Sequence, residues 1–335
     1  MRGQRSLLGI VALAAACGGR VDAVETATDA AGPPIVAPAY EYSPLAVSDA
    51  RALFIAKDPA CSTPTLRSFD RSSGSIKDES RPNETPEYVI EHEGAIYAID
   101  GARGPVRRLV SGDATGQILA SGPSQKAIAF NAGIILLAGL NDGIDSSIVV
   151  RFDGATKRRL FPTPEPRCAA CLAATDDAVV LLTGRRASDH HTLVVGSMSG
   201  GGTRSIDVAI AGDGSPVERL LLRGNTAVLV TEQTIAVVAV DTGRTIFERR
   251  PTDPVRDGYF IGGYLAGEEL VFATRTEFQR LRVFADGAMT VISRLPSALG
   301  KDAQVRAFGG DARGLFAIVV APEFPQGAGL LHHPL

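Results

Sequence analysis

Four residues in the middle of the chain have types and spacing that suit metal or redox chemistry. Cys168 and Cys171 form a Cys-x-x-Cys pair, and His190 and His191 follow further along. Two thiolates and two imidazoles can hold zinc tetrahedrally, whereas two close thiols in an oxidising compartment form a disulfide. We expect a disulfide between Cys168 and Cys171. Pairing of one of them with Cys61 and a zinc site are the alternatives.

Two polar stretches near these cysteines are candidates for a binding surface. Oxygen-bearing side chains of the first stretch are of the kind that calcium prefers, but the stretch lacks the length and distal glutamate of an EF-hand. An ordinary polar turn is therefore expected there. The candidate binding-face residues are Asn141, Asp142, Asp145, Arg185, Arg186 and Asp189.

The composition and the search for motifs argue against several classes of function. The formal net charge is −3, so the chain has no basic excess with which to bind a nucleic-acid backbone. The sequence contains no nucleophile elbow, phosphate-binding loop or zincin motif. We therefore expect no cofactor and no nucleic-acid partner, and a binding module rather than an enzyme.

The N-terminus has the pattern of a signal for export. Arg2 and Arg5 precede a short apolar run at residues 7–13, which is too short to span a bilayer as a helix. Small residues then lead to Cys17, and this segment resembles the lipobox of bacterial lipoproteins. The resemblance implies a signal peptide at residues 1–16, acylation of Cys17 and an extracytoplasmic, membrane-anchored protein. Residues 17–38 are polar and aperiodic, as in a disordered tether.

Short β-rich runs occupy the rest of the chain, and residues 217–250 show them most clearly. Runs at residues 217–222, 226–231, 235–240 and 244–249 are rich in valine and isoleucine, which favour an extended backbone. Gly224-Asn225 and Asp241-Thr242-Gly243 supply the turn geometry between them. Four strands in one short stretch predict an up-and-down sheet.

Similar four-strand units recur at spacings of roughly 40 residues, which is typical of β-propeller blades. We therefore expect an all-β protein with a single propeller domain over residues 39–335. Seven blades fit the count of units best, and six or eight are the alternatives. The last unit is short of strands, and residues 35–42 are expected to supply its outer strand and close the ring.

The turns before the last strand of several units carry an X-Asp-Gly or Asp-Thr-Gly pattern, as at Asp153-Gly154 and Asp286-Gly287. This pattern resembles the consensus of bacterial quinoprotein-like propeller repeats over residues 45–320. The tryptophan with which that family docks its blades is absent here, so the family's cofactor is not carried over. The Trp-Asp signature of WD40 repeats is absent as well.

These patterns lead to one functional expectation and two alternatives. We expect a membrane-anchored β-propeller that binds a protein or another envelope component through its loop-bearing face. A carbohydrate-active or other hydrolytic propeller enzyme is the first alternative. A metal-binding envelope protein is the second.

Overall fold

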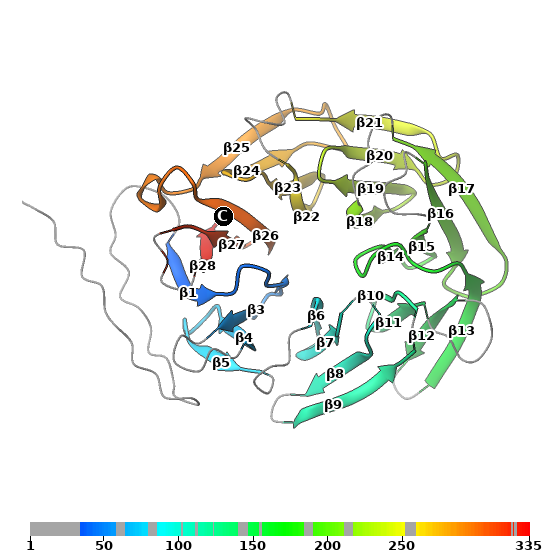
Figure 1. Cartoon of the computed structure of the whole chain (residues 1–335). Coiled ribbons are helices and arrows are strands. Elements are labelled where there is room, and N and C mark those ends of the chain that lie inside the picture. The colour runs from blue at the N-terminus through cyan, green and yellow to red at the C-terminus, as the bar shows by residue number, and fades with distance from the viewer. Residues whose placement is uncertain are drawn as a thin grey trace, which may run out of the picture.

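The computed structural model describes residues 34–57, 64–79, 86–101, 103–110, 113–122, 124–139, 147–153, 156–183, 190–210, 217–251, 259–322, 324 and 327–335. Within these residues the chain forms seven four-stranded sheets, each antiparallel, which follow one another around a ring (Figure 1). The predicted all-β propeller fold is thereby confirmed. We call each sheet a blade and number the blades along the chain.

The first four blades are continuous in sequence. Blade 1 contains β2 (Leu45–Val47), β3 (Arg51–Lys57), β4 (Pro64–Asp70) and β5 (Ile76–Asp78). Blade 2 contains β6 (Tyr88–His92), β7 (Ala95–Ile99), β8 (Val106–Val110) and β9 (Asp113–Ala120). Blade 3 contains β10 (Ala127–Asn131), β11 (Ile134–Ala138), β12 (Ser147–Asp153) and β13 (Thr156–Thr163). Blade 4 contains β14 (Leu172–Ala174), β15 (Ala178–Thr183), β16 (His190–Ser197) and β17 (Thr203–Ala209).

The remaining three blades complete the ring. Blade 5 contains β18 (Val217–Arg223), β19 (Thr226–Thr231), β20 (Ile235–Ala239) and β21 (Thr245–Arg249). Blade 6 contains β22 (Ile261–Ala266), β23 (Glu269–Ala273), β24 (Glu277–Leu281) and β25 (Met289–Arg294). A short 3-10 helix, Ser297–Leu299, follows it. Blade 7 contains β26 (Gln304–Asp311), β27 (Gly314–Val320), β28 (Ala328–Pro334) and β1 (Ile35–Ala39).

The hydrophobic core lies between adjacent blades. The second strand of a blade has a neighbouring blade against each face, so it reads as a continuous apolar run, as in the fully buried β7. One core cluster joins Leu182 and Leu193 of blade 4 to Leu229 and Val238 of blade 5. The outermost strands face solvent and alternate instead, as β21 does. Burial on two faces thus explains why the middle strands carry the strongest sequence signal.

The first strand of the described chain closes the ring. β1 pairs antiparallel with β28, at the outer edge of blade 7, as predicted from residues 35–42. An ion pair between Arg71 of blade 1 and Asp311 of blade 7 also joins the two ends of the ring. Because β1 begins at Ile35, the propeller begins earlier than the predicted domain boundary at residue 39. Residues 35–38 therefore belong to a strand and not to the predicted tether.

The third strand of blade 6 is followed by a buried turn. β24 ends at Leu281, although the apolar residues Val283 and Phe284 come soon after it. The backbone N–H groups of Ala285 and Gly287 both donate to the carbonyl of Arg282, so the chain is already turning there. Val283 is nevertheless buried, because the turn folds back onto the core between blades 5 and 6. Within the described residues, no helix has the length and apolarity that crossing a bilayer requires.

Candidate binding site at the channel mouth

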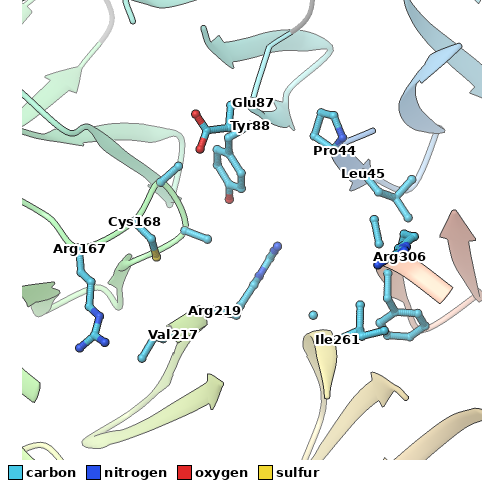
Figure 2. Close-up of a pocket in the computed structure, with 15 residues that line it drawn as sticks. Pro44, Leu45, Glu87, Tyr88, Arg167, Cys168, Val217, Arg219, Ile261 and Arg306 are labelled. Atoms are coloured by element: carbon cyan, nitrogen blue, oxygen red, sulfur yellow. The ribbon is translucent and has the colours of Figure 1, made fainter. Parts of the chain in front are cut away.

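A cavity of about 350 Å³ opens where the inner strands of the ring begin (Figure 2). Its lining comes from six of the seven blades, and blade 3 alone contributes no lining residue within the described chain. The lining residues are Pro44, Leu45, Glu87, Tyr88, Arg167, Cys168, Ala169, Ala170, Val217, Arg219, Ile261, Gly262, Arg306, Ala307 and Phe308. A volume of this size is at the lower end of the range for ligand pockets in proteins.

The antiparallel order of each blade fixes which loops share this face. The chain enters each inner strand here, so the connections from one blade to the next lie on this side. The turns between second and third strands return to the same side, and Glu232 of the β19–β20 turn does line a second cavity of about 280 Å³. The face is therefore the loop-bearing one that the sequence singled out.

The inner strands of blades 5, 6 and 7 are irregular at this mouth. Their pairing with the second strand shifts register at residues 217–219, 261–264 and 305–307. The corresponding pairs of blades 1, 2 and 3 show no shift within the described residues. Gly262 in one shift has φ +57°, and a Cβ there would approach the carbonyl oxygen of Phe308 to 2.9 Å. Bulges bend a strand and redirect its side chains, and they are common beside functional sites.

Blade 4 has a larger interruption that a disulfide closes. Leu182 of β15 pairs through its carbonyl with the N–H of Arg167 and through its N–H with the carbonyl of Cys171. The residues between Arg167 and Cys171 bulge out of the pairing with β15. A disulfide joins Cys168 to Cys171 across a Cα–Cα distance of 5.0 Å. Cys168 faces the cavity, whereas Cys171 is buried.

This disulfide loop is held by the blades on both sides. The carbonyl of Ala169 accepts from the N–H of Ile128 in β10, and the carbonyl of Ala170 accepts from the N–H of Leu220 in β18. Three consecutive inner strands thus meet at the loop. Blade 3 is covered by this loop at the mouth, which accounts for its absence from the cavity lining.

Charged side chains of the cavity point in different directions. Figure 2 shows Arg219 extending from β18 toward the middle of the cavity, where the ring of Tyr88 also points. Arg167 is buried and turns away from the cavity centre, and its guanidinium donates to Nδ1 of His191. This hydrogen bond requires that Nδ1 of His191 carries no proton, because a guanidinium only donates.

The second cavity extends this lining on the side of blades 6 and 7. It shares Ile261, Gly262 and Arg306 with the larger one, and we call the two neighbouring cavities together the hollow. The guanidinium carbon of Arg275 lies 4.8 Å from the centre of the Tyr259 ring, as in a cation–π contact. The pair builds one wall of the hollow.

The structure brings only some of the predicted site residues to this mouth. Cys168 and Cys171 are there, and His191 lies behind them, buried against Arg167. The sulfur atoms are bonded to each other, so the zinc hypothesis requires the reduced pair and stays a prediction. His190 belongs to β16, and its side chain lies outside the described part. The predicted residues that lie outside the described part of the chain are Cys17, Cys61, Asn141, Asp142, Asp145, Arg185, Arg186 and Asp189.

The sequence did not reveal most of the polar residues that line the cavity. Arg219, Arg306 and Tyr88 each stand at the start of an ordinary β-rich run, with no motif around them. The one signal is shared position, because all three fall at the first residues of an inner strand. That shared position indicates a site only when the arrangement of the blades is known, because the ring places the starts of all inner strands at one mouth.

Comparison with known proteins finds the fold and no family. No family model and no curated protein matches the sequence. Among solved structures, "YCF48 bound to D1 peptide" aligns with a TM-score of 0.56 at 8% identity, covering 90% of this chain and 95% of that one. The WD40 beta propeller domain of Doa1 aligns with a TM-score of 0.58 at 10% identity, covering 91% and 95%. Kluyvelomyces marxianus Hsv2 gives 0.52 at 10% identity, covering 87% and 97%.

Proposed function

We propose that this protein is a β-propeller scaffold that binds a segment of a protein partner at its channel mouth. The cavity carries the proposal, because residues from six blades converge on it at the loop-bearing face. Apolar side chains such as Leu45, Val217 and Phe308 line it beside the polar ones, and this mixture suits a peptide. One similar propeller was solved with a bound peptide, which is consistent with the same use.

The proposal includes attachment to a membrane outside the cytoplasm. The apolar run before Cys17 and the small residues beside it support export and acylation of that cysteine. Residues 17–34 would then link the lipid to β1 at the outer edge of blade 7. The channel mouth would face a partner in the cell envelope.

The hydrolytic alternative has less support from the cavity. Glycoside hydrolysis uses two carboxyl groups on either side of the scissile bond. Glu87 is the one carboxylate among the described residues that line the larger cavity, and Figure 2 shows its side chain turned away from the centre. Arginines outnumber carboxylates there, which favours binding over acid–base chemistry.

Site-specific photocrosslinking tests the binding face. A benzophenone amino acid replaces Tyr88 at the mouth, and the control carries it at Ile246 on the outermost strand of blade 5. We expect a discrete adduct in envelope preparations from position 88 and none from position 246. The partner segment, identified by mass spectrometry, is then synthesised and titrated against the purified protein. Tyr88→Ala should weaken its binding and Ile246→Ala should not; equal affinities, or adducts from the outer strand alone, would refute the proposal.

A further inference from the structure

The irregular part of the mouth is confined to four consecutive blades. We call it the bulged sector, and it comprises residues 166–171, 217–219, 261–264 and 305–307. Regular inner strands would place their side chains alternately toward the two neighbouring blades. A bulge breaks this alternation and redirects a side chain. The bulged sector thus marks where the fold departs from its repeat, and both cavities lie against it.

Two arginines occupy the bulges of blades 5 and 7. Val305 and Ala307 pair with consecutive residues of β27, so Arg306 between them has no partner in the β26–β27 ladder. In blade 5 the position without a ladder partner is residue 218. Arg219 follows it and pairs with Val230. Both line the larger cavity, and Arg306 also lines the second one.

These two arginines differ from the ion-paired arginines elsewhere in the ring. Within the described residues, neither the Arg219 nor the Arg306 guanidinium forms an ion pair, a hydrogen bond or a ring contact. Several arginines outside the mouth are instead paired with carboxylates at short distances, whereas the exposed Arg244 forms no ion pair within the described residues. Examples are Arg51 with Glu79 at 2.7 Å, Arg67 with Asp78 at 2.7 Å and Arg107 with Asp100 at 2.6 Å.

The charge of the hollow is opposite in sign to that of the whole chain. Its described lining contains four arginines, Arg167, Arg219, Arg275 and Arg306, against two carboxylates, Glu87 and Glu232. The formal net charge of the chain is −3. A positive hollow in a negative molecule attracts a local anionic group while the rest of the surface repels an extended polyanion.

Resting on the function proposed above, we infer that Arg219 and Arg306 bind the side-chain carboxylates of an acidic peptide segment at the bulged sector. The planar guanidinium matches a carboxylate with two parallel N–H···O bonds, so each arginine selects an Asp or Glu side chain. The cavity of about 350 Å³ accommodates a few side chains of an extended segment. Apolar neighbours such as Ile261 lower the local dielectric and strengthen these bonds.

Binding of a defined peptide tests this inference. The probe is a short fluorescent peptide of alternating Glu and Gly, compared by anisotropy with the same peptide carrying Gln for Glu. We expect the Glu peptide to bind and the Gln peptide not to. Arg219→Gln and Arg306→Gln should each weaken binding roughly tenfold, as expected for a lost hydrogen bond to a charged group. Binding should also weaken as salt is raised.

Arg244→Gln provides the matched control. It removes the same charge from an exposed residue of the β20–β21 turn, which lies on the opposite face of the ring. Circular dichroism and melting temperature check that each variant is folded. Equal affinity for the Glu and Gln peptides, or equal losses in Arg219→Gln and Arg244→Gln, would overturn the inference. So would displacement of the peptide by inorganic phosphate at equimolar concentration, because the site would then be a phosphate site.

The two proposals fail in different ways. If the Tyr88 crosslinks persist in the Arg219→Gln, Arg306→Gln double variant at unchanged yield, the mouth binds a partner without these arginines. The scaffold function would then stand and the acidic-peptide inference would fall. If the acidic peptide binds as expected but no adduct forms at position 88, the anionic site stands and the protein-binding scaffold falls.

Discussion

At the scale of single residues, Lys126 shows how a charged group organises the loops beside the channel. Its side chain is fully buried at the entrance to blade 3. Its ammonium group donates to the carbonyl oxygens of Gly122 at 2.7 Å, Ser124 at 2.9 Å and Arg103 at 3.2 Å. Burial lowers the pKa of Lys126, and the nearby carboxylate of Glu165 opposes this shift. The three carbonyls accept from one donor group, so the connection from blade 2 depends on it.

We expect Lys126→Met to destabilise the protein by about 2 kcal/mol, because three carbonyl oxygens lose the ammonium group that donates to them. Chemical denaturation measures the change in the free energy of unfolding. Lys301→Met, at an exposed position after the 3-10 helix, is the matched control and should change stability by less than about 0.5 kcal/mol. Similar stabilities of the two variants would show that the ammonium group organises nothing.

At the scale of elements, β28 is the strand on which ring closure depends. It pairs with β27 on one side and with β1 on the other. His332 in this strand stacks on Phe316 of β27, with ring centres 4.3 Å apart and an angle of 10° between the planes. Burial first, and then the positive charges of Arg71 and His333, lower the pKa of His332 below 6.5, while Asp311 acts in the opposite direction. Burial also lowers the pKa of His333.

The closing strand should therefore weaken in acid. A histidine whose pKa is lower in the folded state is held neutral by folding, so its contribution is complete above 6.5. That contribution is lost as the pH falls through the lower pKa of the folded state. We expect the melting temperature to fall as the pH drops below 6.5, and His332→Phe, which keeps the stacking, to flatten this fall. Parallel pH profiles for the wild type and this variant would contradict the assignment.

At the scale of the whole molecule, the proposed lipid anchor at Cys17 leads to a prediction about where the propeller is located. We expect the wild-type protein to fractionate with membranes and to incorporate a radioactive fatty acid. Cys17→Ala should remove the label and leave a soluble protein or an uncleaved precursor, because no thiol remains to acylate. Unlabelled, fully soluble wild-type protein would rule out the anchor.

The sequence predicted most of the ring. Middle strands such as β19 are buried on both faces, so they consist of apolar and β-branched residues. Such runs can be recognised in the sequence alone. The closing strand β1 was predicted from a different argument, since an incomplete last unit leaves an edge that must be covered. The end of the third strand of blade 6 is harder to predict, because Val283 is buried within a turn and local hydrophobicity does not distinguish a buried turn from a strand.

The site was less predictable than the ring. The Cys168-x-x-Cys171 pattern pointed to the mouth because cysteine spacing limits the possible chemistry. Arg219 and Arg306 carry no such pattern, and their roles depend on register shifts that only the paired strands reveal. One residue inserted in a strand changes where a side chain points without changing the composition of the run.

The confinement of the bulges to blades 4 to 7 has a consequence for orientation. Seven identical blades would form a mouth of sevenfold rotational symmetry, on which a ligand has seven equivalent poses. The disulfide loop and the three bulges break that symmetry, so the seven poses differ in energy from one another. A ligand with one allowed pose in place of seven equivalent ones loses RT ln 7, or about 1.2 kcal/mol, of binding free energy from statistics alone. We therefore expect a linear ligand, bound at the mouth as proposed, to cross it in one preferred direction.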